Sequence, residues 1–247
     1  MRYLVLTDIH ANLEALDTCL ADARARGFDR TLVLGDLVGY GADPNAVIER
    51  VQALDPFAIV RGNHDKVGCG LEPPEAFNAV ARSAIRWTYD TLRPEHRAWL
   101  AGLPQGPKTV DGLMEICHGS PFDEDAYIFD ELDALRALKV SGRPLCLFGH
   151  THFAVTFALT ANSVDTISPA RPRDAIVPLA PGGKYLLNPG AVGQPRDGDP
   201  RAGYAIVDDS QQIVELYRVP YPIEEAQAKV LKAGLPEVLA QRLAVGR

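Results

Sequence analysis

Apolar runs alternate with segments of helical periodicity at the start of the chain. Residues 2–7, 31–34 and 57–60 are short, apolar almost throughout and bounded by loop signals. Runs of this kind are typical of strands that are buried on both faces, as in a sheet covered by helices. Residues 12–26 and 44–54 lie between these runs and repeat apolar residues at helical spacing. This order predicts right-handed β-α-β crossovers and a largely parallel sheet.

The middle of the chain continues both patterns. Residues 75–102 predict two helices that are broken at Pro94. Residues 130–139 predict another helix, which connects strand-like runs at 113–118 and 145–148. The α/β character of the first part of the chain therefore extends to about residue 150.

The pattern changes after His152, where strand-like segments are joined by Gly, Pro and Asp turns. These segments are 153–160, 184–187, 203–207 and 212–218. They indicate a second, more antiparallel sheet. The stretch 161–183 is rich in Ser, Pro, Arg and Ala, and it predicts a mobile loop. Residues 223–245 predict helices with a break at 234–236, and their apolar spacing indicates a packing or interface role.

Length and composition are those of an ordinary globular protein. The chain has 247 residues, of which 47% are hydrophobic and 23% charged, with no internal repeat or low-complexity linker. We therefore expect one domain over residues 1–247, with 223–247 as a C-terminal helical segment packed on it. No apolar run of about 18 residues is present, so we expect no membrane span. The N-terminus predicts a strand rather than a signal peptide, which predicts a cytoplasmic protein.

The net charge of −7 and the pI of about 5.4 bear on the class of partner. Proteins that grip the nucleic-acid backbone usually carry a basic face, and no Lys/Arg-rich run occurs here. We therefore expect no dedicated nucleic-acid-binding surface. A small phosphate-ester or nucleotide substrate remains compatible with this charge, because bound cations would supply the local positive potential.

Five of the six histidines fall in short polar motifs, and each motif follows a predicted strand. The motifs are Asp8-x-His10, Gly35-Asp36, Gly62-Asn63-His64-Asp65, His118 and Gly149-His150-Thr151-His152. Ligands of open α/β sheets bind outside the carboxyl ends of the strands, so these side chains are expected to converge. The remaining histidine, His96, is predicted to be a surface helix residue.

The donor atoms of these motifs predict a metal site. Oxygen and nitrogen donors without a thiolate suit ions such as Mn²⁺, Fe²⁺, Zn²⁺ or Mg²⁺. Seven donors are too many for one tetrahedral zinc and suit two ions about 3.5–4 Å apart that share a carboxylate. The predicted ligands are Asp8, His10, Asp36, Asn63, His118, His150 and His152.

In this order the motifs closely resemble those of the calcineurin-like metallophosphoesterases. That family has the pattern D-x-H, G-D, G-N-H-D/E, H and G-H-x-H, and every motif is intact over about residues 1–220. The resemblance implies a four-layer αββα sandwich of two mixed β-sheets flanked by helices. It also implies one ion on Asp8, His10, Asp36 and His152, another on Asp36, Asn63, His118 and His150, and Asp36 between them.

Two further segments are similar to a bacterial and archaeal branch that includes small phosphodiesterases. They are residues 35–41 (GDLVGYG) and 188–196 (NPGAVGQPR). The resemblance implies hydrolysis of a phosphate ester by a hydroxide held between two divalent ions. Manganese is our first choice of metal, and iron, zinc, nickel, cobalt and magnesium are alternatives, because availability decides among ions that accept such donors.

Residues near the motifs are candidates for catalysis or substrate contact. His64 is predicted to act as a general acid or hydrogen-bond donor to the leaving group, with Asp65 fixing its tautomer. The candidates for substrate contact are Asn12, Tyr40, Arg61 and Arg196. Asn12 is already explained as the N-cap of the helix at 12–26, and Arg196 lies in a Gly/Pro/Asp loop where no core role is expected.

Three functions are compatible with the sequence. The first is a phosphodiesterase that acts on small or nucleotide-like substrates. The second is a phosphomonoesterase, which includes phosphoprotein and dinucleoside-polyphosphate phosphatases. The third is a non-catalytic metal-binding scaffold, which would be marked by loss of ligands, whereas all seven are present. A homo-oligomer is compatible with each function.

Overall fold

The computed structural model describes residues 1–160, 163–167 and 175–247. The helices in these ranges are α1 (Leu13–Arg26), α2 (Pro44–Ala53), α3 (Asn63–Cys69), α4 (Ala79–Thr91), α5 (Pro94–Ala101), α6 (Glu131–Val140), α7 (Ile223–Lys232) and α8 (Glu237–Val245), with a 3₁₀ turn at Pro74–Ala76. Both predicted helix breaks, at Pro94 and at 234–236, are present.

The first sheet has the strand order β3-β2-β1-β11-β12-β9. Its strands are β1 (Arg2–Leu6), β2 (Arg30–Val33), β3 (Ala58–Ile59), β9 (Ala175–Pro178), β11 (Ala202–Asp208) and β12 (Ile213–Val219). The strands β1, β2 and β3 run parallel, as predicted, and the other neighbours pair antiparallel.

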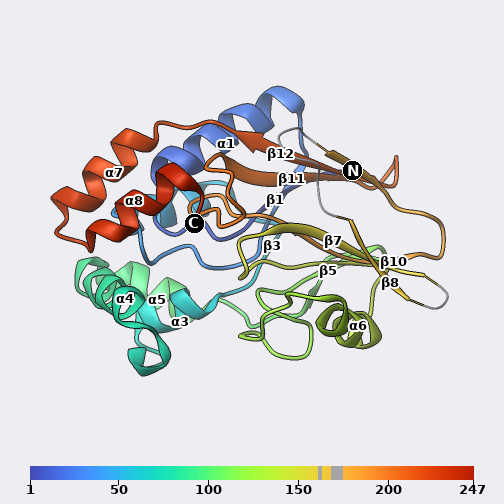
Figure 1. The fold of residues 1–247 in the computed structure, drawn as a ribbon, viewed down its shortest axis with the longest axis horizontal. Coiled ribbons are helices and arrows are strands. Elements are labelled where there is room, and N and C mark those ends of the chain that lie inside the picture. The colour runs from blue at the N-terminus through green and yellow to red at the C-terminus, as the bar shows by residue number, and fades with distance from the viewer. Residues whose placement is uncertain (161–162, 168–174) are drawn as a thin grey trace.

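The second sheet has the strand order β4-β5-β6-β10-β7-β8 and faces the first (Figure 1). Its strands are β4 (Lys108–Thr109), β5 (Met114–Ile116), β6 (Leu145–Leu147), β7 (Ala154–Leu159), β8 (Val164–Ile167) and β10 (Lys184–Pro189). It is also mixed, because β6 lies parallel to both β5 and β10 while β7 is antiparallel to β10.

Side chains that alternate along the strands form three layers of core. Tyr3 and Val5 of β1 face the second sheet and pack in the cluster that contains Leu145 and Leu187. The residues between them, such as Leu4, face α1 and α2. On the far side, α6 packs on the outer face of the second sheet. This alternation has a period of two, and it builds the predicted αββα sandwich.

Two expectations about the second half of the chain were wrong. The strands after His152 do not form a sheet of their own, because β9, β11 and β12 complete the first sheet and β7, β8 and β10 complete the second. The stretch 161–183, predicted as a mobile loop, contains β8 and β9, while residues 161–162 and 168–174 within it lie outside the described part. Both β8 and β9 are edge strands of four residues: β8 exposes three of its residues, and β9 is a short apolar run that ends in Pro178, so neither gives a clear strand pattern.

His96 also differs from the expectation. Its side chain is 4% exposed, and its Nδ1 atom lies 2.8 Å from Oδ1 of Asn45. The ring is therefore a buried hydrogen-bonding group between α5 and α2, and not a surface residue. In the part of the chain that is described, no helix is both long and apolar enough to span a bilayer.

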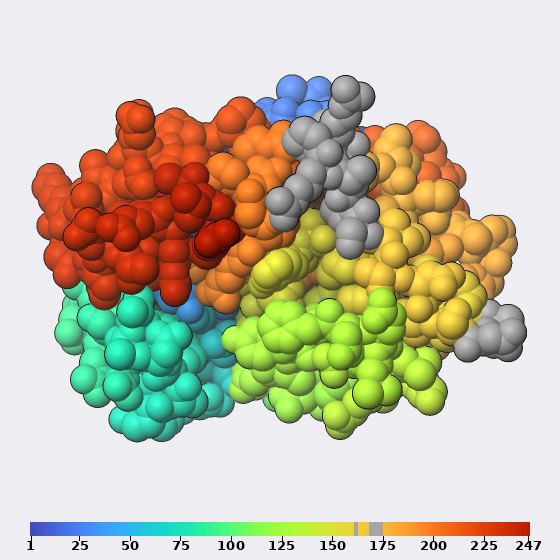
Figure 2. Space-filling view, viewed as in Figure 1, coloured from blue at the N-terminus to red at the C-terminus, as the bar shows by residue number. Residues whose placement is uncertain are grey.

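The C-terminal helices pack against the rest of the protein beside α4 (Figures 1 and 2). Leu239 of α8 is buried in a cluster with Tyr40, Ala84 and Val230. Truncation of a buried leucine typically costs about 2–5 kcal/mol of stability. We therefore expect Leu239→Ala to lower the free energy of unfolding by this amount, measured by urea denaturation.

Leu132→Ala is the matched control, because Leu132 is 75% exposed on α6. It should change the stability by no more than about 0.5 kcal/mol, as is usual for surface positions. Equal stability of the two variants would show that α8 is not part of the cooperative core.

Candidate metal centre

The loops that follow β1, β2, β3, β5 and β6 bring the predicted ligands together at one edge of the two sheets. Two groups of donor atoms form there, and within each group all donors lie within 4.8 Å of one another. The first group is Asp8, His10, Asp36 and His152, and the second is Asp36, His118 and His150. Asp36 belongs to both, so the geometry can hold two ions that share this carboxylate.

The hydrogen bonds of the first group show that its residues fit a cation. His10 Nδ1 lies 3.0 Å from the carbonyl oxygen of Val38, and His152 Nδ1 lies 2.6 Å from that of Gln194. A carbonyl oxygen can only accept, so both Nδ1 atoms carry the proton and both Nε2 atoms present lone pairs. These two Nε2 atoms face each other at 3.0 Å. Two lone pairs that face each other at this distance suit a cation bound by both atoms.

In the second group, too, backbone carbonyl oxygens orient the histidine rings, and Asn63 lies beside them. His118 donates from Nδ1 to the carbonyl oxygen of Leu34 at 2.8 Å, so Nε2 is the ring nitrogen that points inward. That Nε2 atom lies 3.3 Å from Asn63 Oδ1 and 3.3 Å from Asp36 Oδ2, both of which are acceptors. His150 uses the opposite nitrogen, because its Nε2 lies 3.0 Å from the carbonyl oxygen of Asp125. Its Nδ1 atom is therefore the one left for an ion.

Backbone and hydroxyl donors orient the two carboxylates. Asp8 accepts from the Thr7 hydroxyl at 2.9 Å and from the His150 backbone N–H at 3.1 Å. Asp36 accepts at Oδ1 from the His64 backbone N–H at 2.9 Å. These bonds leave Asp36 Oδ2 directed toward His10 and His118, at 3.5 and 3.3 Å from their Nε2 atoms. Oδ2 is thus the atom placed between the two groups.

The burial of these groups sets their charge. Burial lowers the pKa of His10 to about 4 and the pKa of His150 to about 3, so both are neutral ligands at neutral pH. Burial also raises the pKa of Asp8 to about 7. Burial disfavours the charged forms of both His118 and Asp36, but the attraction between their opposite charges is stronger. The pKa of His118 therefore rises to about 10, and the pKa of Asp36 falls well below its usual value. Without a metal, a proton on His118 balances Asp36, and a cation would take its place.

The backbone at these positions is held in an uncommon conformation. Asp8, His10, Asp36, His150 and His152 all have φ between 48° and 66°, in the left-handed region that residues with a side chain rarely adopt. Strain of this kind persists only where the surrounding structure imposes it, and it clusters at functional sites. The occurrence of this backbone conformation at five predicted ligands supports a functional site at this position.

Two glycines allow the loops to approach each other. A β-carbon on Gly62 would collide with Oδ1 of Asp36, and one on Gly149 would collide with the Thr7 hydroxyl beside Asp8. Only glycine leaves room for both carboxylates at these points. The glycines in the third and fifth motifs are therefore as necessary to the geometry as the ligands.

Asp65 has a different role from the one predicted. Its carboxylate accepts from the backbone N–H groups of Leu37, Val38 and Gly62 at 2.8–3.3 Å. It thereby ties the loop after β2 to the start of α3, and it makes no hydrogen bond to the His64 ring. The His64 Nδ1 atom has no hydrogen-bond partner among the described residues and packs against Gly39. Packing, and not Asp65, fixes the orientation of His64.

A cavity of about 260 Å³ opens beside the second group of donors. Asn63, His64 and His150 line it, and Tyr40, Phe77 and Tyr127 contribute aromatic rings to its walls. The Tyr40 ring packs on His64 with 4.4 Å between centroids. Burial lowers the pKa of His64 well below 6.5, so this imidazole faces the cavity in its neutral form.

The four candidate substrate residues differ in their surroundings. Tyr40 lines the cavity, and the Arg196 guanidinium lies 5.6 Å from the centre of its ring. Arg61 is held by a bidentate pair with Glu124 at 2.9 and 3.0 Å. Asn12 caps α1 as predicted, and its amide N–H group donates to the Gly193 carbonyl at 2.8 Å. Asn12 and Arg61 are therefore engaged inside the protein.

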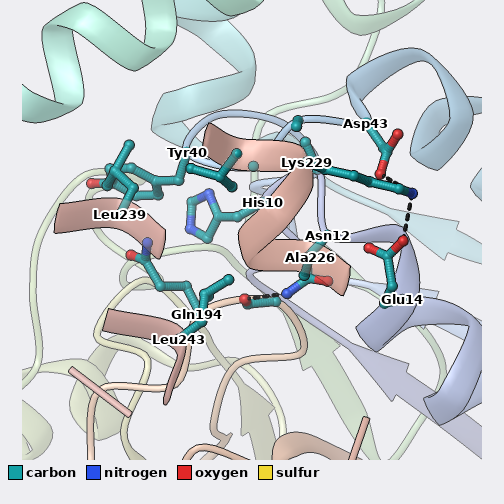
Figure 3. Close-up of a pocket in the computed structure, with 15 residues that line it drawn as sticks. His10, Asn12, Glu14, Tyr40, Asp43, Gln194, Ala226, Lys229, Leu239 and Leu243 are labelled. Carbon is teal, nitrogen blue, oxygen red and sulfur yellow. Dashed lines mark hydrogen bonds and ion pairs between the residues drawn. The ribbon is translucent and has the colours of Figure 1, made fainter. Parts of the chain in front are cut away.

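The C-terminal helices lie beside His10, where Leu239 and Leu243 of α8 line a second pocket together with the His10 ring. Figure 3 shows His10 and Tyr40 beneath α7 and α8, close to Leu239. Lys229 of α7 forms ion pairs with Glu14 and Asp43, which joins α7 to α1 and to the start of α2. These helices thus shield the first donor group from solvent without contributing a ligand.

Sequence reasoning missed the residues that support the ligands through the backbone. Asn188 donates to the Gly149 carbonyl at 2.8 Å and to the Thr151 hydroxyl at 3.0 Å, which holds the loop of His150 and His152. Asp125 acts on His150 through its carbonyl oxygen. A backbone contact leaves no signal in residue type, so Asp125 could not be found from the sequence. Asn188 stood in a segment already noted for its resemblance.

The comparisons with known proteins agree with this geometry. Residues 1–212 match the calcineurin-like phosphoesterase superfamily domain. The chain is 35% identical over 250 residues to an uncharacterized protein from Methanocaldococcus jannaschii, which covers 98% of this chain and 97% of that protein. The chain therefore belongs to the calcineurin-like phosphoesterase superfamily, whose members bind divalent metals and act on phosphate esters.

Solved structures show the same fold. The structure is similar to that of a metallophosphoesterase from Sphaerobacter thermophilus, with 40% identity and a TM-score of 0.87 over 100% of this chain and 99% of that chain. A hypothetical protein from Pyrococcus horikoshii OT3 has 21% identity and a TM-score of 0.78 over 100% and 98% of the two chains, and it supports the fold alone. The family and the αββα architecture predicted from the motifs are thus confirmed.

Proposed function

We propose that the protein is a phosphodiesterase that hydrolyses small phosphate diesters, including nucleotide-like ones, with two divalent cations. One cation would be held by Asp8, His10, Asp36 and His152, and the other by Asp36, Asn63, His118 and His150. The observation that carries the proposal is the position of Asp36 Oδ2 between His10 Nε2 and His118 Nε2. At this position one carboxylate oxygen can coordinate a cation in each of the two donor groups.

Manganese is our first choice of metal, and the donor set is compatible with it because hard oxygen donors and imidazoles are combined without a thiolate. When bound, two such ions make water a nucleophile at neutral pH and neutralise the charge of the phosphoryl oxygens. The protein supplies the shape of the site: His64 faces the cavity where the leaving group would lie, and a neutral imidazole can donate a hydrogen bond to a departing oxygen. Tyr40 and Arg196 are our candidates for contact with the remainder of the substrate.

The charge of the cavity favours a diester over a monoester. Its described lining includes the carboxylates of Glu72 and Asp125, and one ammonium group behind the wall, that of Lys66, pairs with both, so that one negative charge of this pair of carboxylates stays unbalanced by Lys66. A monoester carries close to two negative charges at neutral pH, whereas a diester carries one and repels these carboxylates less. Phosphomonoesterase activity is the second candidate, and it would require the cations alone to balance the additional charge. A non-catalytic scaffold is disfavoured because every donor is present and all of them except the half-buried Asn63 are buried.

A hydrolysis panel tests the proposal. The purified protein is assayed with bis-nitrophenyl phosphate, nitrophenyl phosphate, nucleotides and cyclic nucleotides, each with manganese, magnesium, zinc or no added metal. We expect kcat/KM to be highest for diesters and to require an added cation after chelation. A higher kcat/KM for monoesters across all metals would replace the diesterase assignment, and no hydrolysis of any ester with two ions bound would favour the scaffold.

A further inference from the structure

Lys66 is a buried ammonium group on α3 that is not part of the candidate metal centre. Its side chain is 2% exposed, and its Nζ atom lies 3.1 Å from Glu72, 3.2 Å from Glu124 and 2.7 Å from Asp125. A lysine is rarely buried unless it is paired, because removing an isolated charge from water is very costly. The three carboxylates around Lys66 therefore stabilise its buried charge and fix the position of its ammonium group.

Asp125 connects Lys66 to the metal centre. Its carboxylate contacts Lys66, and its carbonyl oxygen accepts the hydrogen bond from Nε2 of His150 at 3.0 Å. The bond places the imidazole proton on Nε2 and leaves the Nδ1 lone pair for an ion. The same segment also fixes the face of the ring, because Tyr127 stacks on His150 with 3.9 Å between centroids and 21° between planes.

The segment around Asp125 lies between β5 and α6 and is held largely by side chains. Its backbone forms local turns, with Gly119 N–H bonded to the Glu124 carbonyl at 3.1 Å. Glu124 is bound by both Arg61 and Lys66, which lie before and within α3. These ion pairs therefore attach the segment to α3, the helix that carries Asn63 and His64.

We propose that Lys66 is a positioning residue for His150, which it orients through Asp125 so that Nδ1 faces the second ion. This inference rests on the two-ion centre proposed above. His150 belongs only to the second group of donors, and the first group has no contact with Asp125 among the described interactions. Loss of Lys66 should thus weaken the second ion selectively.

The test uses the metal-free protein and the variant Lys66→Met, which keeps a long side chain and removes the charge. Titration with Mn²⁺, followed by calorimetry, should show the first ion binding within about twofold of the unaltered protein. The second ion should bind about 10–100-fold more weakly, the usual effect of losing an outer partner of a metal-ligating histidine. Nitrogen NMR of the metal-free protein should also show His150 shifting from one tautomer to a mixture.

Two control variants separate this role from a general effect on stability. Glu72→Gln removes another Lys66 partner that has no bond to His150, and Arg2→Met breaks an ion pair with Asp208 and Glu215 at the far end of β1. Both should leave the two affinities within about twofold. Asp125→Ala should reproduce the Lys66→Met effect, and the double variant should lose little more than either single one, because both residues act in one chain of contacts.

If Lys66→Met does not fold, Asp125→Ala still tests the link, since that side chain is 46% exposed. The inference is overturned if the folded Lys66→Met or Asp125→Ala protein binds both ions as tightly as the unaltered protein and keeps a single His150 tautomer. A different result, in which the unaltered protein itself never binds a second ion, would refute the proposed function instead. The two failures are therefore distinguishable.

Discussion

Asp36→Asn should abolish nearly all hydrolysis and lower the occupancy of both ions. The amide has two orientations, and each is unfavourable. If its NH₂ group takes the place of Oδ1, it meets the His64 backbone N–H, so that two donors face each other. If the NH₂ group takes the place of Oδ2, it occupies the position between His10 and His118 where a shared ligand is required. Loss of a residue that only hydrogen-bonds to a metal ligand typically lowers activity by about 10–100-fold. Because Asp36 is itself a candidate ligand of both ions, we expect its replacement to lower kcat by more than about 10²-fold.

Arg196→Ala is the comparison variant. Arg196 lies near Tyr40 and outside both donor groups, so its loss should raise KM more than it lowers kcat and should leave both ions bound. Metal content and steady-state kinetics, measured on both variants, test whether Asp36 is shared by the two ions. Turnover of Asp36→Asn within about tenfold of the unaltered protein would contradict the bridging role of this carboxylate.

His64→Ala should reduce hydrolysis according to how much help the leaving group needs. Nitrophenolate departs readily without a proton, whereas an alkoxide such as a ribose oxygen does not. Acid assistance in such a step is typically worth about 10²–10⁴-fold, so esters of alcohols should lose up to this factor and nitrophenyl esters much less. His64 is not one of the predicted ligands, so both ions should remain bound.

Values of kcat/KM must be compared under conditions in which chemistry is rate-limiting. His64→Asn serves as the second variant, because it retains a hydrogen-bonding group of smaller size. An equal loss for both classes of leaving group, with two ions retained, would assign His64 to the shape of the loop.

The sequence predicted the parts of the fold that carry a strong apolar signal. Strands such as β1 and β2 are buried on both faces, and their carboxyl ends had to meet at one edge, so the convergence of Asp8 and Asp36 followed from strand order. The partner of each later strand could not be predicted in the same way. Alternation shows which face of a strand is buried but not which sheet it joins, and β8 and β9 are short edge strands without a clear strand pattern.

The site was predictable where side chains act directly and unpredictable where the backbone acts. The seven candidate ligands could be named because their types and positions are visible in the sequence, and the structure brings six of them into the two donor groups. The role of Asp65 was mistaken because its partners are backbone N–H groups of the loop after Asp36. The link from Lys66 to His150 was invisible because it passes through a carbonyl oxygen of Asp125, which every residue possesses.

The central claim is that one chain binds two ions on either side of Asp36. The most direct measurement is metal stoichiometry after saturation with Mn²⁺, by elemental analysis together with anomalous scattering from crystals. The account predicts two ions per chain, about 3.5–4 Å apart, with Asp36 in contact with both. No more than one ion per chain, or two ions without Asp36 between them, would contradict it.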